Sequence, residues 1–300
     1  MKDLLEELKN LVLKESLIEG INTTNIPSMI IFKSSNITKE LQTVYEPSLF
    51  VILQGAKIVT IGKKVITYDN SSFLISSTYL PISGRIVKAS ENEPFLSFKI
   101  SFTLEEIFEA IKEFSITLDK NKSSLALCSY KINEELLDTV FRLFKLSKKE
   151  KDIKTLLKMY KKELLYHLLI TNKTIELLQL SFIEGNAYKI SKAISFMNKD
   201  LYESLSIEEI AKRVNMSVSN FFKYFKTFTA LTPLQYRKIQ KLQEARRLMI
   251  TQNMDISGAA FQVGYLSNSQ FSREYTSYFG INPSLDIKNI KKSGIALFNT

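Results

Sequence analysis

Residues 207–225 read IEEIAKRVNMSVSNFFKYF, and residues 256–275 repeat the pattern as ISGAAFQVGYLSNSQFSREY. In both copies the apolar positions recur every three or four residues, which is helical spacing. Three features recur at matching positions, namely a small residue at a helix crossing, a turn residue that tolerates a positive φ, and a serine that can cap the next helix: Ala211 and Ala260, Asn215 and Gly264, Ser217 and Ser267. The pattern predicts two helix-turn-helix motifs, at about 206–227 and 255–278.

A plain helical domain, in which Ala and Gly merely ease packing, is the alternative explanation of these features. The turn residue and the serine cap recur together in both copies, and an apolar-periodic helix from Leu234 to Met249 joins the copies. That combination favours a repeated DNA-reading unit over simple packing. The second helix of each copy would enter the major groove, and the joining helix would hold the two about one helical turn, or ~34 Å, apart.

Five short motifs carry a resemblance to a known family: TPLQY (232–236), QEARRL (243–248), VGYLS (263–267), SQFSREY (269–275) and FGINP (279–283). The stretch 189–287 resembles the DNA-binding domain of AraC-family (AraC/XylS-type) transcriptional regulators. The chain departs from the family pattern at Ala230, where a glycine is usual, and at Lys241, where an arginine is common. The segment Leu285-Asp286-Ile287 replaces a Tyr-Arg ending.

The part of the chain before residue 186 has a different residue pattern. Between about 23 and 103, short β-rich runs alternate with turn-like pieces such as Gln54-Gly55 and Gly62-Lys63, which is typical of a β-sandwich or barrel. The segments PSL (47–49), LQGAK (53–57) and LPISG (80–84) resemble the cupin-like N-terminal domain of a subgroup of AraC-type regulators. We therefore predict a two-domain chain, with a mainly-β cupin-like barrel and flanking helices first and an all-α domain with two helix-turn-helix motifs second.

The expected strands and helices follow from local patterns. The strand runs are 29–32, 49–53, 57–61, 65–68, 73–76, 82–87 and 95–102, and helical spacing predicts helices over 3–17, 104–114, 134–146 and 151–170. We divide the chain into a regulatory and dimerisation domain at 1–185, with the helices at 104–183, and a DNA-binding domain at 186–300. The apolar stripes of the later helices either pack on the barrel or form the seam of a homodimer, and the resemblance favours the dimer.

The net charge of +10 is concentrated in one half of the chain. Residues 186–300 hold 16 Lys and Arg against 8 Asp and Glu, whereas residues 1–185 hold 25 against 23. Together with the paired motifs, this excess indicates a surface that binds a polyanion. The sequence has no apolar run long enough to cross a membrane and no signal-peptide pattern, and its single cysteine suits a reducing compartment. We expect a cytoplasmic protein without a membrane partner.

The composition of the barrel argues against catalysis. Metal-dependent cupins hold their metal with clustered histidines and a carboxylate, and residues 1–166 contain no histidine. We therefore expect no catalytic residues, no metal, no cofactor and no enzymatic activity. The barrel interior either houses a small-molecule ligand or is filled by Leu, Ile and Phe, and the sequence does not identify ligand-binding residues.

The exposed faces of the second helices supply the candidate DNA-binding residues. Phe221, Phe225, Phe271 and Tyr275 are expected to face the core. Asn and Gln can pair with adenine, Arg with guanine and Ser with either base. Position by position, the resemblance implies the base readers Ser219, Phe222, Lys223, Asn268, Ser269, Gln270 and Arg273. Phe222 would contact a thymine methyl or serve in packing. We assign phosphate contacts to Ser217, Lys226 and Ser272.

These observations predict a sequence-specific DNA-binding transcription regulator controlled by a small-molecule signal at the N-terminal barrel. Its partners would be double-stranded promoter DNA, a small-molecule effector, a second copy in a homodimer and, for an activator, RNA polymerase. The first alternative is a DNA-binding regulator without a ligand, controlled by abundance or by a protein partner. The second is a cupin-type enzyme with a DNA-binding appendage.

Overall fold

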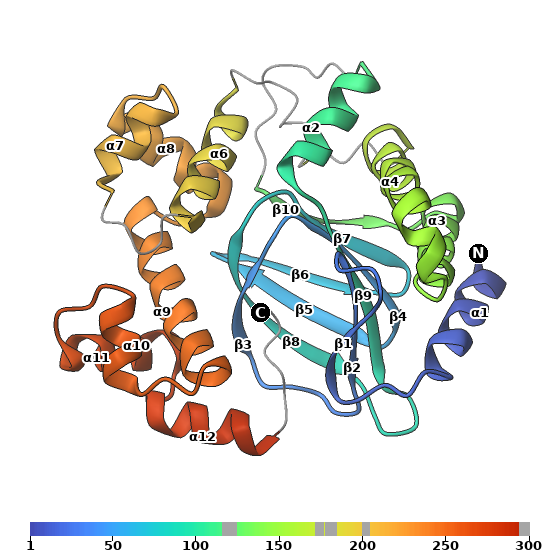
Figure 1. The fold of residues 1–300 in the computed structure, drawn as a ribbon, viewed down its shortest axis with the longest axis horizontal. Helices are drawn as coiled ribbons and strands as arrows, with labels where there is room; N and C mark the ends of the chain where they lie inside the picture. Colours follow the sequence, from blue (N-terminus) through green and yellow to red (C-terminus); the bar gives the residue numbers. More distant parts are fainter. Residues whose placement is uncertain (116–124, 172–176, 178–184, 200–204, 294–300) are drawn as a thin grey trace.

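The computed structural model describes residues 1–115, 125–171, 177, 185–199 and 205–293. The N-terminal part holds two antiparallel sheets (Figure 1). In order across the larger sheet, the strands are β1 (Gly20–Thr23), β2 (Met29–Ser34), β9 (Phe95–Ser101), β4 (Ser48–Gln54), β7 (Ser72–Ser76) and β10 (Leu127–Lys131). Across the smaller sheet they are β3 (Leu41–Tyr45), β8 (Leu80–Lys88), β5 (Ala56–Ile61) and β6 (Lys64–Asp69).

Alternation of side chains along the strands places the core between the sheets. In β5, Lys57, Val59 and Ile61 are buried while the residues between them are half-exposed, as expected for a strand with one face inward. In β4, on the larger sheet, every residue from Ser48 to Leu53 is buried, so this strand is covered on both faces. All seven predicted strand runs overlap observed strands, whereas β1, β3 and β10 are additional.

Four helices flank the sheets, namely α1 (Lys2–Leu13), α2 (Leu104–Glu113), α3 (Glu134–Leu146) and α4 (Glu150–Tyr166), and a π-helical turn η1 (His167–Thr171) follows α4. Helix α3 buries the apolar stripe expected from its sequence, and the ring of Phe144 lies 5.7 Å from that of Phe98 on β9. The predicted helices at 104–114, 134–146 and 151–170 correspond to α2, α3 and α4 with η1. Part of the predicted helical segment 104–183 lies outside the described residues.

The C-terminal part is helical throughout its described length: α6 (Asn186–Lys199), α7 (Ile207–Arg213), α8 (Val218–Thr229), α9 (Pro233–Thr251), α10 (Ile256–Gln262), α11 (Asn268–Phe279) and α12 (Pro283–Ser293). Helix α9 joins two helix-turn-helix units, α7–α8 and α10–α11 (Figure 1). The predicted fold class, a mainly-β part followed by a helical part with two such units, is confirmed.

The two units are embedded differently in the molecule. The buried side chains of α6, α7 and α8 belong to the same hydrophobic core as the sheets, whereas α10 and α11 have a core of their own with the second half of α9. The amide of Ala126, next to β10, donates a 3.1 Å hydrogen bond to the carbonyl of Phe228 near the end of α8. A Cβ placed on Gly62, in the turn before β6, would lie 2.9 Å from the Ala230 Cβ. The first unit therefore packs directly on the sheets.

Cys128, the single cysteine of the chain, is half-buried on β10. None of the helices within the described ranges is both long and apolar enough to cross a membrane.

Candidate nucleic-acid interface

The two helix-turn-helix units share one turn geometry. The amides of Met216 and Tyr265 donate hydrogen bonds of 2.9 Å to the carbonyls of Ala211 and Ala260, respectively. At the turn itself, Asn215 has φ +53° and Gly264 has φ +81°. Both values lie in the left-handed region that glycine and asparagine tolerate best. The positive φ expected at both positions is thus observed.

Each second helix begins at a serine cap. Ser217 Oγ accepts a hydrogen bond from the Asn220 amide at 3.4 Å, and Ser267 Oγ accepts one from the Gln270 amide at 3.3 Å. A capping side chain satisfies one of the amides that a helix start leaves unpaired. The caps fix where α8 and α11 begin, and so fix which of their residues face outward.

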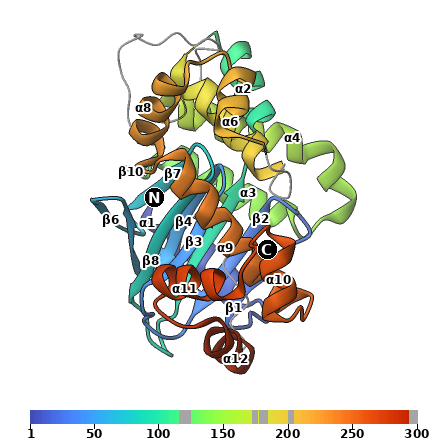
Figure 2. The same ribbon diagram turned by 90° about the vertical axis from the view of Figure 1, so that its left-hand side faces the viewer.

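The aromatic residues expected to anchor these helices are fully buried. Phe221 and Phe225 lie in the first core with ring centroids 5.4 Å apart, and Phe271 and Tyr275 lie in the second at 5.5 Å. Because these residues recur at four-residue spacing on one side of each helix, the other side is left to solvent. Figure 2 shows α8 and α11 with α9 running between them.

Most of the predicted base readers lie on those solvent-exposed sides. Ser219 and Lys223 are exposed on α8, and four more are exposed on α11, namely Asn268, Ser269, Gln270 and Arg273. Phe222 differs from them because it is half-buried and packs against the first core. Of the predicted phosphate contacts, Ser217 and Lys226 are exposed and Ser272 is half-buried.

Polar side chains on α11 are partly organised by hydrogen bonds. Asn268 Nδ2 donates to Ser257 Oγ at 2.7 Å, and Gln270 Nε2 donates to Glu274 Oε1 at 3.2 Å. The Tyr265 hydroxyl donates to the other oxygen of Glu274 at 2.9 Å. Burial, together with the nearby Glu274 carboxylate, raises the pKa of Tyr265, so its hydroxyl stays protonated and remains a donor. The Glu274 carboxylate is therefore occupied by neighbours on its own unit.

Helix α9 holds the two units at a fixed distance. A capping box starts it, in which the Thr232 hydroxyl accepts from the Gln235 amide and the Gln235 side chain accepts from the Thr232 amide. Its first half buries Tyr236 in the first core, and its second half buries Leu242 and Ala245 in the second. The basic residues of α9 are not among the predicted DNA-binding residues, although Lys241 lies one helical turn after Arg237 and Lys238.

The interior between the two sheets contains a buried lysine. Lys57 is buried, and its ammonium lies 5.5 Å from the centroid of the Tyr45 ring. Burial raises the pKa of the neighbouring Tyr68 well above its usual value, and the proximity of Tyr45 adds to the effect. Among the residues that the structure describes, no three His, Cys, Asp or Glu side chains gather where they could hold a metal ion.

Comparison with protein families agrees with this geometry. Residues 25–174 match the model described as the AraC-type transcriptional regulator N-terminus, and residues 210–287 match a model described as a helix-turn-helix domain. The first match alone spans half of the chain.

Individual relatives match between about a third and two fifths of the chain. The lactose operon transcription activator of Staphylococcus xylosus is 32% identical over 95 residues, which is 32% of this chain and 34% of that protein. The XylDLEGF operon transcriptional activator 2 of Pseudomonas putida is 28% identical over 127 residues, covering 40% of this chain and 80% of that protein. The region shared with the lactose operon activator is thus about a third of that relative's length.

The likeness to solved structures extends over nearly the whole chain. ToxT from Vibrio cholerae, solved with an unsaturated fatty acid bound, superposes with a TM-score of 0.58 at 13% identity, covering 93% of this chain and 100% of that chain. At this identity the likeness shows a shared fold. Taken with the two family matches and the paired helix-turn-helix geometry, it leads to one assignment: the chain belongs to the AraC-type transcriptional regulators.

Proposed function

We propose that this protein is a sequence-specific DNA-binding regulator of transcription. The observation that carries the proposal is the matched pair of serine-capped helices, α8 and α11, each anchored by buried aromatic residues and exposing polar side chains on its other side. Two such helices joined by a continuous helix can enter successive major-groove segments on one side of a duplex. The relatives named as operon activators support this function.

In this proposal the exposed residues of α8 and α11 divide into readers and positioners. Lys223 and Arg273 would recognise guanine, and Asn268, Ser269, Gln270 and Ser219 would contact other base edges. Ser217, Lys226 and Ser272 would contact phosphate oxygens, which hold the protein in register without reading sequence. Phe222 would pack against the first core and so hold α8 in place. The exposed part of its ring would contact a thymine methyl group.

We further propose that a small molecule bound in the N-terminal part controls the protein in the cytoplasm. The ToxT structures solved with an unsaturated fatty acid and with a substituted butenoic acid support ligand control in this architecture. The effector would shift the population between two arrangements of the sheets and the DNA-reading units. The rival, a regulator without a ligand, is favoured by the densely buried Leu, Ile and Phe side chains between the sheets.

A homodimer is the proposed assembly, with α4 as its seam. Leu156, Leu157 and Tyr160 are only half-buried on α4, and Met159 is 62% exposed. Such a row of incompletely covered apolar side chains is suited to pairing with a second copy about a two-fold axis. RNA polymerase would be a further partner if the protein activates transcription. We propose no enzymatic activity, in keeping with relatives that are named as regulators.

The test is selection of bound duplexes from a random pool by the purified full chain, followed by sequencing. We expect an enriched motif with two half-elements about one helical turn apart. Binding that depends on salt but enriches no motif would overturn the proposal, because it would show phosphate contact without base readout. Ligand control is tested separately, by a thermal-shift screen of small molecules on the same full chain.

A further inference from the structure

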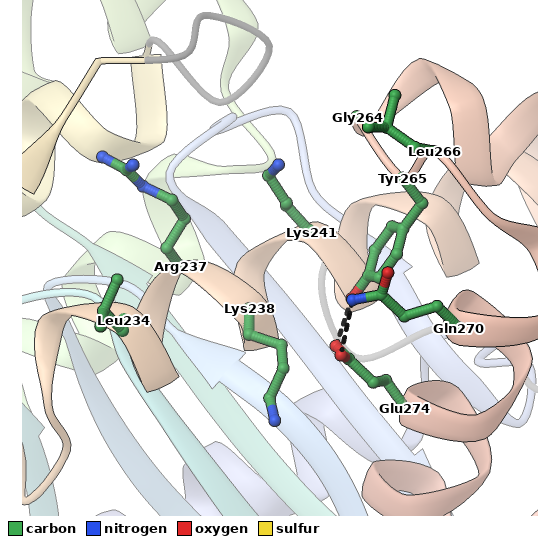
Figure 3. A pocket seen from close by; sticks show the side chains of 9 residues that line it. All are labelled: Leu234, Arg237, Lys238, Lys241, Gly264, Tyr265, Leu266, Gln270 and Glu274. Carbon is green, nitrogen blue, oxygen red and sulfur yellow. Dashed lines mark hydrogen bonds between the residues drawn. The ribbon is translucent and has the colours of Figure 1, made fainter.

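A groove of about 310 Å³ lies between the joining helix α9 and the second recognition helix α11 (Figure 3). One wall is formed by Leu234, Arg237, Lys238 and Lys241 of α9, and the other by the α10–α11 turn and by two α11 residues, Gln270 and Glu274. Arg237 and Lys241 extend along one side of the groove and Lys238 along the other. Three cationic side chains thus line one concave surface, although Lys238 points away from the other two.

Among the described residues, no carboxylate pairs with these cations. No Asp or Glu of that part of the chain lies within salt-bridge distance of Arg237, Lys238 or Lys241. The carboxylate in the groove wall, Glu274, already accepts hydrogen bonds from Tyr265 and Gln270. The groove therefore has an excess of positive charge that an anion could neutralise.

Burial makes the excess positive charge of the groove energetically unfavourable when no anion is bound. Arg237 and Lys241 are half-buried, and burial lowers the pKa of each. The charge of Arg237 lowers the pKa of Lys241 further, while the charge of Glu208 only partly offsets the effect of burial on the pKa of Arg237. A cation that loses hydration without gaining a paired counter-charge is destabilised. An anion in the groove would offset this destabilisation of the cations. The groove is therefore suited to bind a negatively charged partner.

The local backbone brings one of the cations close to the second reading unit. A Cβ placed on Gly264 would lie 3.0 Å from Lys241 Nζ. The bare glycine at the α10–α11 turn therefore allows the ammonium to lie against the turn that precedes α11. Gln270, a predicted base reader, lines the same groove. The positive charge is thus placed beside the surface expected to meet DNA.

The position of α9 identifies which part of the DNA would come near. Helix α9 runs between α8 and α11 (Figure 2). If these helices enter two successive major-groove segments, the sugar-phosphate backbone that separates the segments passes across the helix between them. Phosphodiester groups carry the negative charge that the groove lacks, and they are spaced regularly along each strand.

We propose that Arg237 and Lys241, assisted by Lys238, bind the phosphate backbone of the DNA between the two half-elements. The proposal rests on the proposed function and adds a third point of contact to the two recognition helices. This contact does not read sequence; it sets the distance between the half-elements by holding the backbone that separates them. A free phosphate or another small anion has the same chemistry, and the experiment distinguishes it from DNA.

The test compares the salt dependence of DNA binding by the full chain and by its variants Arg237→Gln, Lys241→Gln and the double substitution. Each phosphate contact contributes about 0.9 to the slope of log K against log salt. We expect each single variant to lose about 0.9 from the slope and the double variant about twice that. Affinity should fall by the same factor for the selected duplex and for an unrelated one, with the selected motif unchanged.

Two controls make the result specific. Lys2→Gln removes one exposed charge from α1, distant from the groove, and should leave the slope unaltered. Arg237→Lys keeps the charge and should retain the slope, and thermal unfolding checks that every variant is folded. A folded double variant with the slope of the unaltered chain would overturn the proposal. So would a loss of affinity confined to one base position, which would mean base readout.

The alternative anion source is tested with inorganic phosphate and the same variants. If phosphate raises the thermal midpoint of the unaltered chain but not of the double variant, while the DNA slopes agree, the groove binds a free anion and the proposal fails. If no motif is selected but the slopes still fall, the proposed sequence-specific function fails while the phosphate contact stands. The two results are thus separable.

Discussion

Arg246 on α9 and Asp286 on α12 form a buried ion pair. Arg246 Nη2 donates to Asp286 Oδ1 at 2.9 Å, and Nε lies 2.8 Å from Oδ2, with both side chains 8% exposed. The Tyr275 hydroxyl of α11 donates to the same carboxylate at 2.6 Å. One carboxylate on the last helix therefore ties together the joining helix and the second recognition helix, even though the segment around it departs from the family pattern.

Replacing Asp286 with Ala should destabilise the protein strongly. The change leaves the Arg246 guanidinium buried without a counter-charge, which typically costs about 3–5 kcal/mol. The double substitution Arg246→Met with Asp286→Leu should cost less than Asp286→Ala, because it removes both charges. Denaturant unfolding of the three proteins measures the difference. A single variant as stable as the unaltered chain would mean that the pair does not hold α12 in place.

Removing Arg273 should relax the sequence preference of the second half-element. Arg273 is exposed on α11, and an arginine that pairs with guanine contributes about 1–3 kcal/mol of discrimination. We expect Arg273→Ala to lose that amount on the selected duplex and to equalise the four bases at one position. Lys223→Ala should act in the same way on the first half-element. Equal losses on selected and unrelated duplexes would instead assign these residues to phosphate.

Ala230 caps α8 in a conformation that suits glycine. Its φ is +63°, and its counterpart at the end of α11 is Gly280, with φ +73°. Left-handed backbone costs a non-glycine residue about 1–2 kcal/mol, while the added freedom of glycine in the unfolded chain costs about 0.4–1 kcal/mol. Ala230→Gly should therefore raise the free energy of unfolding by about 0.5–1 kcal/mol.

Gly280→Ala is the matched control for Ala230→Gly. A Cβ at Gly280 would meet no atom within 4 Å, so the change tests backbone strain without a steric clash. It should lower the free energy of unfolding, opposite in sign to Ala230→Gly. If both substitutions shift thermal unfolding in the same direction, backbone strain does not account for the effect.

Alkaline pH should destabilise the second unit through its tyrosines. Burial raises the pKa of Tyr278 to about 12, although the Gln243 amide and Arg246 lower it. In the unfolded chain the pKa of a tyrosine is about 10. Above that pH, Tyr278 therefore loses its hydroxyl proton more readily in the unfolded chain than in the folded one. The stabilising contribution is complete below about pH 10 and is lost as pH rises towards about 12. Urea unfolding at several pH values should show a smaller alkaline fall for Tyr278→Phe than for the unaltered chain.

Local sequence patterns were sufficient to predict the helices, turns and caps in most of the second half of the chain. The turn residues Asn215 and Gly264 and the caps Ser217 and Ser267 act through neighbours only a few residues away, so sequence spacing reveals them. The base contacts assigned to the exposed residues remain predictions, since exposure alone does not test them.

Two of the three strands that the sequence did not reveal pair with strands far away in the chain, namely β3 with β8 and β10 with β7. β1 contains Gly20 and Asn22, which are poor strand formers, and becomes a strand by pairing with β2. β10 follows a helix and pairs with β7, about fifty residues earlier, so its local pattern does not identify it. The basic groove was missed for a similar reason: α9 supplies its charges, but α11 supplies the wall that makes them a site.

The continuity of the first core has a consequence for building hybrid regulators. Because α6, α7 and α8 share their buried side chains with the sheets, a chimera joined before α6 would replace one half of a packed interior with unmatched residues. A junction within α9, after Tyr236 and before Leu242, falls between the two cores instead. Exchanging only the residues C-terminal to such a junction would transplant the second reading helix and keep the first core intact, and the residues of α11 that lie against β3 would be the ones to match in the hybrid.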